Sequence, residues 1–342
     1  MNRMIIKLFF YLCILTALPS YAQNAVHYYF KTMDIRNGLS QNTVYQILQD
    51  RKGFMWFGTK DGLSRYDGLS FRIYNNENSN LGRNFITVLY EDSKGNIWVG
   101  TDGGLYIYNP ILDSFTEFNL VSDKGTVIRD FVTMIRCDEH SNLWISVENQ
   151  GLFCYNSDEN KLRNYLHDAG LANVHRFWLN GNTCWLALYG DNLYYTKAGF
   201  ESPLQPFKDA NGNEIFKGDI INCEVVGPHN YTYIASSNGL TEVNFVTGKS
   251  RRILDAFART LEFKSDDELW VGTEKGLYIY NLTTNKLTHL TVPDQDDSYA
   301  LSDNAIYSIY RDRENGMQRR KHCARRRAHT RRRPCVCHRL RQ

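Results

Sequence analysis

Polar side chains that could hydrogen-bond a ligand recur just ahead of a series of short apolar runs. Amides and acids stand two residues before several of these runs, and arginine, glutamine or histidine stand beside them. Such groups together suit the hydroxyls of a sugar and its uronate or sulfate groups. The candidate ligand-binding residues are Gln41, Asn42, Arg83, Asn84, Arg129, Asp130, His175, Arg176, Asp219 and Asn304. Turn chemistry is an equally open interpretation, because Asn and Asp are also favoured where a chain turns into a strand.

Motifs for catalysis or for cofactor binding are absent from the sequence. We find no nucleophile elbow, phosphate-binding loop or kinase motif, and the histidines are scattered. The sequence therefore predicts no enzyme activity, no cofactor and no metal site. A cluster near the C-terminal end fits none of the standard zinc spacings. Its members are His322, Cys323, Cys335, Cys337 and His338.

The apolar runs belong to a repeated pair of β-strands. Residues 95–109 read GNIWVGTDGGLYIYN, in which two apolar runs are joined by a Gly-containing turn, as in a β-hairpin. An aromatic anchor recurs in six such units at spacings of 42, 46, 41, 48 and 37 residues. The anchors are Trp56, Trp98, Trp144, Trp185, Tyr233 and Trp270. Several short strands repeating every 40 to 50 residues or so predict the blades of a β-propeller.

Each unit predicts four strands. The innermost strand, at residues 44–48 in the first unit, precedes a polar turn, the Trp strand, the Gly-Leu-Tyr strand and an outer strand. The candidate ligand-binding residues lie in the loops that enter the inner strands, so they should ring the mouth of the central channel. We expect the Trp side chains to pack between blades. The Asp at the start of the polar turn, such as Asp50, should cap that turn.

The blade count follows from the anchors and from one further inner strand. Residues 304–313 align without gaps on residues 42–51 and start a partial blade at about residue 302. We expect an all-β, seven-bladed propeller of four-stranded blades over residues 23–317, with six blades complete and the seventh truncated. Residues 26–31 should supply the outer strand of that last blade and close the ring.

The two ends of the chain differ in composition from the repeats. Residues 1–22 read as a signal peptide, with Arg3 and Lys7 ahead of an eleven-residue apolar core, and predict export to the periplasm. Residues 318–342 hold ten Arg and no acid, and begin where the repeat's next Trp is due. We expect this tail to result from a frameshift and to be disordered, and we expect no nucleic-acid partner because it has no aromatic residue. The gap in the ring should favour self-association, of which a homodimer is one form.

Four cysteines lie within the repeats, at 137, 154, 184 and 223. An exported protein could join them in two disulfides. Their positions within different strands favour free, buried thiols instead, and both states stay open.

The repeat signature D-x-x-G-x-x-W-[VI]-G-T-x-x-G-L-x-x-Y resembles the two-component regulator propeller repeat. The first, second and sixth units match it best. The resemblance implies the periplasmic sensor propeller of a hybrid two-component system of gut Bacteroidetes, anchored in the inner membrane in its full-length form. It also implies a second propeller, an immunoglobulin-like domain, a histidine kinase, a receiver and a DNA-binding domain downstream. Its ligand would be a glycan fragment, and its output would be polysaccharide-utilisation genes.

Two other functions fit a propeller of this kind. The first is a protein-interaction module. Direct glycan binding by the propeller would favour the sensor over this function. The second is a propeller lyase or glycosidase, which would need converging acid and base residues on one face. Propeller folds host many functions, so the repeat alone does not choose between them.

Overall fold

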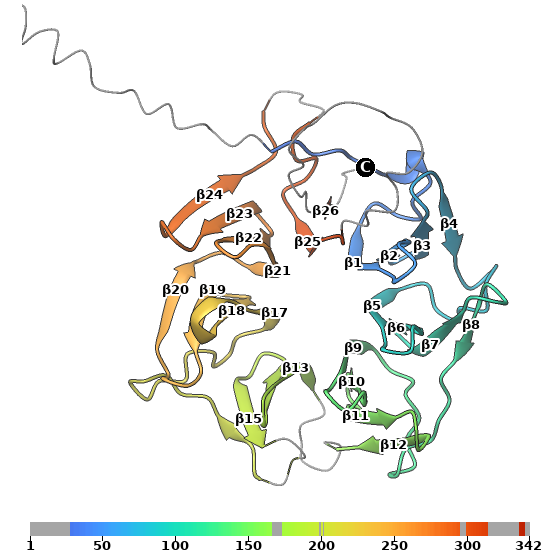
Figure 1. Cartoon of the computed structure of the whole chain (residues 1–342), viewed down its shortest axis with the longest axis horizontal. Coiled ribbons are helices and arrows are strands. Elements are labelled where there is room, and N and C mark those ends of the chain that lie inside the picture. Colours follow the sequence, from blue (N-terminus) through green and yellow to red (C-terminus); the bar gives the residue numbers. More distant parts are fainter. Residues whose placement is uncertain are drawn as a thin grey trace, which may run out of the picture.

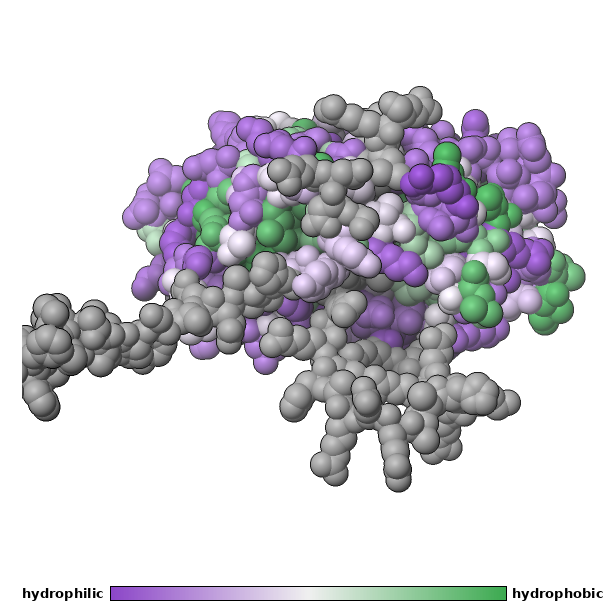
Figure 2. Space-filling view, turned by 90° about the horizontal axis from the view of Figure 1, so that it is seen from above, coloured by the Kyte–Doolittle hydropathy of each residue, from purple (hydrophilic) through white to green (hydrophobic). Residues whose placement is uncertain are grey.

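The computed structural model describes residues 28–165, 173–197, 200, 202–294, 299–313 and 335–338. Six four-stranded antiparallel sheets surround a central opening as blades (Figure 1). In each blade the first strand in the chain lies at the opening, and the next three follow outwards in order. The predicted all-β propeller is therefore confirmed. Seen edge-on, polar residues dominate the surface and apolar residues reach it in separate groups (Figure 2).

The blades are numbered one to six along the chain. Blades one to three comprise β1 (Val44–Gln49), β2 (Met55–Thr59), β3 (Gly62–Tyr66), β4 (Phe71–Tyr74), β5 (Ile86–Glu91), β6 (Ile97–Thr101), β7 (Gly104–Asn109), β8 (Ser114–Glu117), β9 (Val132–Cys137), β10 (Leu143–Val147), β11 (Gly151–Asn156) and β12 (Lys161–Asn164). Blades four to six comprise β13 (Val174–Asn180), β14 (Thr183–Leu188), β15 (Leu193–Lys197), β16 (Gln205–Pro206), β17 (Ile221–Val226), β18 (Tyr231–Ser236), β19 (Gly239–Asn244), β20 (Ser250–Leu254), β21 (Ala258–Ser265), β22 (Glu268–Thr273), β23 (Gly276–Asn281) and β24 (Lys286–Leu290). Two short 3₁₀ helices, η1 (Ile35–Asn37) and η2 (Pro228–Asn230), lie in loops.

The prediction of seven blades, with the seventh truncated, is wrong. The structure has six four-stranded blades, and β25 (Ile306–Tyr310) pairs instead with β26 (Cys335–His338) in a two-stranded sheet. The backbone groups of β25 need partners, and the tail supplies them although its composition argued against a strand. Residues 28–31 form no strand. Tyr28 packs its ring against Trp270, with ring centroids 5.4 Å apart.

An Asp–Trp contact organises the turn between the first two strands of blades one, two and three. In blade one, Asp50 Oδ1 accepts from the backbone N–H of Lys52 and Phe54, and its Oδ2 accepts from Trp56 Nε1 at 2.9 Å. The same bond joins Asp92 to Trp98 and Asp138 to Trp144. The expected turn cap is thus confirmed, and the same carboxylate also fixes the indole. Blade six uses Glu268 in its place, at 2.7 Å from Trp270 Nε1.

The Trp side chains lie between blades, as predicted. Trp56 is 0% exposed and contacts Tyr108 of blade two, with ring centroids 4.9 Å apart. Blades approach closely beside this layer. A Cβ at Gly100 of β6 would lie 2.4 Å from Val88 and 2.9 Å from Val132 of blade three. Only a glycine fits there without displacing the neighbouring inner strands.

One inner strand has a charged residue where its counterparts are apolar. In each blade, one inner-strand residue pairs with the residue directly after the aromatic anchor. It is Ile47, Leu89 or Ile135 in blades one to three, and Glu224 of β17 in blade five. The Glu224 side chain is 2% exposed and forms an ion pair with Arg136 of β9. The blades on either side of blade four are therefore joined by an ion pair between a buried carboxylate and a guanidinium that is 40% exposed.

Glu262 of β21 should make the stability of the propeller depend on pH. Burial raises its pKa to about 7 from the ordinary 4.5, and Arg311 opposes the rise. Because the folded pKa is the higher one, the stabilising contribution is present below about pH 4.5 and lost as pH rises through about 7. Glu262→Gln should flatten this dependence and raise the melting temperature at pH 8. Thermal melts at pH 5 and pH 8 test this. Exposed Glu77→Gln should keep the wild-type change in melting temperature between the two pH values. An equal change for both variants would contradict the role of Glu262.

The predicted signal peptide at residues 1–22 and most of the tail at 318–342 lie outside the described residues. Within the described ranges, no helix combines the length and the apolar character needed to cross a membrane. The four cysteines of the blades are free thiols.

Candidate functional site

A β-bulge near the start of every inner strand shapes one end of the central opening. The register shifts by one residue between the first and third residues of each of these strands, so one residue is left unpaired. We call this end of the opening the mouth, since the inner strands begin there. The bulged residues are Tyr45, Thr87, Thr133, His175, Asn222, Arg259 and Tyr307.

Several bulged side chains reach the next inner strand of the ring. Thr87 Oγ1 donates to the carbonyl of Val132 at 2.6 Å, and Asn222 Nδ2 donates to that of Ala258 at 2.8 Å. Thr133 Oγ1 lies 3.4 Å from the carbonyl of Val174 in the same way. The bulges thus connect neighbouring blades at the level of the mouth.

Four aromatic rings form a continuous arc across the mouth. Tyr45 lies between Tyr307 and Phe85, with ring centroids 5.2 and 5.1 Å away, and Phe85 continues to Phe131 at 5.6 Å. All four residues are only partly buried. Phe85 and Phe131 each stand immediately before an inner strand, whereas Tyr45 and Tyr307 are bulged residues. The arc is therefore an accessible apolar surface drawn from several sheets.

Two cations border this aromatic arc. Lys60 Nζ lies 5.3 Å from the ring centroid of Phe85 and 5.7 Å from that of Tyr45. Arg259 lies 4.5 Å from the ring of Tyr307 and forms an ion pair with Glu274. A cation over a ring face is favourable, so both positive charges are held beside the arc.

The three predicted asparagines hold the loops that enter the inner strands. The side-chain oxygens of Asn42, Asn84 and Asn304 accept backbone N–H groups of Ile35, Asn76 and Val292, at 3.0, 2.9 and 2.8 Å. Turn chemistry, which the sequence left open, thus accounts for their oxygens. Each Nδ2 group has no hydrogen-bond partner within the part of the chain that the structure describes.

The predicted acids and Gln41 also make contacts within loops. Asp219 is buried and accepts from Ser236, Ser237 and Asn238 of the neighbouring hairpin. Asp130 Oδ1 accepts from the N–H of Phe131, and Gln41 Oε1 lies 3.4 Å from the N–H of Lys60. These contacts place Asp130 and Gln41 next to the aromatic arc. They leave Asp219 with a structural contact inside blade five.

The three predicted arginines and His175 differ in position. Arg83 and Arg129 are exposed in entry loops. Arg83 lies across Gly103, where a Cβ would meet its Nε at 2.5 Å. His175 and Arg176 lie within β13 rather than before it. Burial, with the neighbouring Arg176, lowers the pKa of His175 to about 4, so its ring is neutral at pH 7.

The structure therefore brings most of the predicted residues to the mouth and adds the aromatic arc, which the sequence analysis missed. A usable signal existed, because Phe85 directly follows Asn84 and Phe131 directly follows Asp130. Aromatic faces beside amides, arginines and a lysine suit a ligand with an apolar face and a polar edge. Among the described residues, no group of three or more His, Cys, Asp or Glu side chains could hold a metal ion.

Comparison with known proteins identifies part of the repeat. Residues 38–61 and 80–103 match the model of the two component regulator propeller family. These segments cover the inner and Trp strands of blades one and two. A stretch of 60 residues, 18% of this chain, is 45% identical to histidine kinase P4 of Formosa agariphila and spans 4% of that protein.

Solved structures share the fold across most of the chain. The extracellular domain of a proposed hybrid two-component system from B. thetaiotaomicron matches with a TM-score of 0.71 and 23% identity, over 84% of this chain and 39% of that one. Virginiamycin B lyase from Staphylococcus aureus matches with a TM-score of 0.54 and 14% identity, over 75% of this chain and 86% of that one. At these identities both likenesses concern the fold alone. The chain spans well under half of the two-component relatives that it matches.

Proposed function

Because the chain carries two-component regulator propeller repeats at residues 38–61 and 80–103, we propose that it is the ligand-sensing propeller of a hybrid two-component regulator, exported to the periplasm. The aromatic arc at the mouth is the observation that supports a direct ligand site. Tyr307, Tyr45, Phe85 and Phe131 offer adjacent ring faces, and Lys60 adds a charge at their border.

The ligand in this proposal is a glycan fragment. A sugar ring has an apolar face of C–H groups and a rim of hydroxyls, which matches ring faces bordered by amides. Uronate or sulfate groups would meet the guanidinium groups of Arg83 and Arg129, whose paired N–H donors suit the oxygens of such anions. The other predicted site residues would act mainly by positioning the loops.

Signalling in this proposal is a shift in packing. A ligand that binds one arrangement of the propeller more tightly than another changes their populations. That change would pass to a downstream propeller, an immunoglobulin-like domain and a kinase, and so to polysaccharide-utilisation genes. The likeness to the extracellular domain of a proposed hybrid two-component system supports the sensor role in this proposal.

Phe85→Ala should weaken oligosaccharide binding by about tenfold, or about 1.4 kcal/mol, because it removes the ring in the middle of the arc. Isothermal titration of the purified chain against neutral, uronate-bearing and sulfated oligosaccharides measures this. Phe54→Ala is the matched control, since Phe54 is partly buried in the turn after β1, at the opposite end of the opening. It should change affinity less than twofold.

Arg83→Ala and Arg129→Ala serve as a second arm of the same titrations. They should weaken binding of the sulfated and uronate-bearing members while leaving the neutral ones unchanged. Equal losses from Phe85→Ala and Phe54→Ala would reject the mouth as the site. A panel without any binder would reject the glycan proposal for this chain.

A further inference from the structure

A cavity lies between blades three and four, on the opposite face of the propeller from the mouth. It has a volume of about 750 Å³. Its lining includes the last residues of β9 and the turn from Asp138 to Asn142 that follows, whereas mouth residues lie at or before the first residues of the inner strands. Six residues of β9 separate the two ends, about 16–20 Å at 3.3 Å per residue. The cavity is therefore distinct from the candidate site at the mouth.

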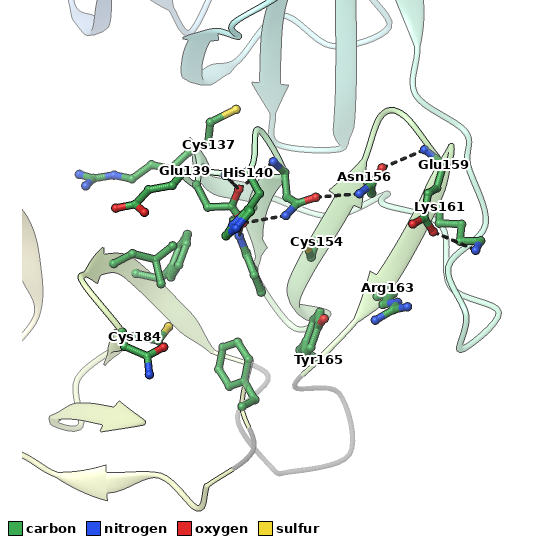
Figure 3. Close-up of a pocket in the computed structure, with 18 of the residues that line it drawn as sticks. Cys137, Glu139, His140, Cys154, Asn156, Glu159, Lys161, Arg163, Tyr165 and Cys184 are labelled. Carbon is green, nitrogen blue, oxygen red and sulfur yellow. Dashed lines mark hydrogen bonds and ion pairs between the residues drawn. The ribbon is translucent and has the colours of Figure 1, made fainter. Parts of the chain in front are cut away.

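Two cysteines leave room for the cavity, because their side chains are smaller than those at the same positions in most other blades. Cys154 of β11 pairs with Trp144, a position where Arg65, Ile107, Tyr195, Glu242 and Ile279 stand in other blades. Cys184 of β14 precedes its blade's Trp, where Met55, Ile97, Leu143 and Leu269 stand in four other blades and Thr232 stands in blade five. Both thiols line the cavity from neighbouring blades (Figure 3). Two small side chains at one boundary thus replace bulky ones.

The floor of the cavity is aromatic. Trp144 contacts Tyr165, Phe177 and Phe200, with ring centroids 5.2, 5.5 and 5.8 Å away. Tyr165 and Phe200 are partly exposed, and their rings lie 5.2 Å apart. Protein interiors have few voids larger than a water molecule. A space of this size with an aromatic floor has the volume and lining of a small-molecule pocket.

Several charged side chains that line the cavity have polar partners. Lys161 Nζ is 2.9 Å from Glu159, and Arg136 is paired with Glu224. Asp138 accepts from Asn142 and Trp144 at 2.9 Å each. Figure 3 shows Lys161 beside Glu159 on the blade-three side and Cys184 across the space. The charges of the lining balance, with Arg136, Lys161 and Arg163 against Asp138, Glu139 and Glu159, so no net charge favours an ionic ligand.

We propose that this cavity binds an uncharged ligand with a flat apolar ring, which lies on Trp144, Tyr165 and Phe200 between the two thiols. Hydroxyl or amide groups at the edge of such a ligand would face Asn182 and His140, which line the rim. By touching blades three and four together, the ligand stabilises their boundary. It would act independently of a glycan at the mouth.

The test uses 2-naphthol as an uncharged probe and 2-naphthoate as its charged counterpart, each titrated into the full chain. We expect a submillimolar dissociation constant for 2-naphthol and at least tenfold weaker binding of 2-naphthoate. A rise in melting temperature should accompany saturation with 2-naphthol. Absence of 2-naphthol binding overturns the proposal, and equal binding of the two probes overturns its uncharged ligand class.

Filling the cavity gives the decisive variant. Cys154→Ile with Cys184→Leu installs the side chains that blades two and three hold at these positions, so it should fold, lose probe affinity at least tenfold and keep binding at the mouth. Unchanged probe affinity overturns the proposal. If the double variant does not fold, Phe200→Ala against Phe131→Ala decides. The first should weaken 2-naphthol at least fivefold and the second less than twofold, and equal effects overturn the proposal.

Discussion

Replacing Arg136 by alanine is expected to destabilise the propeller by about 3–5 kcal/mol, which is among the largest single losses in the chain. The change leaves the Glu224 carboxylate, 2% exposed, without its counter-charge inside the ring. Urea denaturation followed by circular dichroism measures the change in the free energy of unfolding.

A double variant separates the pair from the packing of its side chains. Arg136→Met with Glu224→Leu removes both charges and gives blade five the apolar residue that Ile47, Leu89 and Ile135 supply in other inner strands. Its stability should return to within about 1–2 kcal/mol of the original or exceed it, because a buried ion pair is often replaceable by apolar residues. A single Arg136→Ala loss below about 1 kcal/mol would show that water reaches Glu224.

Asp50→Ala should cost about 3 kcal/mol, since it removes three hydrogen bonds at once and buried donors left unpaired cost about 1–3 kcal/mol each. The affected groups are the N–H of Lys52, the N–H of Phe54 and the indole of Trp56, which is 0% exposed. Denaturation in urea checks the magnitude.

Blade four supplies the matched control for this contact. Trp185 is buried, but its Nε1 has no hydrogen-bond partner among the residues that the structure describes. Trp185→Phe therefore loses ring volume alone, whereas Trp56→Phe also leaves Asp50 Oδ2 without its donor. The Trp56 variant should be the less stable by about 1–3 kcal/mol. Equal losses would mean that the Asp–Trp bond contributes little beyond ring packing.

Features repeated within one blade could be read from the sequence. The hairpin at residues 95–109 appears as β6 and β7. The Asp of the polar turn before β6 caps that turn, as the pattern indicated. These features are local, because hydrophobic runs, a Gly turn and an Asp cap act within about ten residues. The blade count failed for the complementary reason. The partner of β25 is β26, in the tail, whose composition argued against any strand.

Site features that arise between blades were not readable in this way. The arc joins Tyr307 to Tyr45 across most of the chain, and it depends on bulges that appear only once two strands are paired. The cavity needs small residues in two adjacent blades at the same boundary, which no single repeat reveals. The asparagines of the loops were found from their spacing, but that spacing could not separate a ligand contact from a turn contact.

The contacts within the aromatic arc bear on the entropy of binding. Each ring already rests against a neighbour, and the bulges that carry Tyr45 and Tyr307 fix their backbones before any ligand arrives. Ordering a free side chain on binding costs about 0.5–1.5 kcal/mol. Here that cost is met during folding, so a rigid ligand would associate with little loss of side-chain freedom and its affinity would be dominated by desolvation and enthalpy.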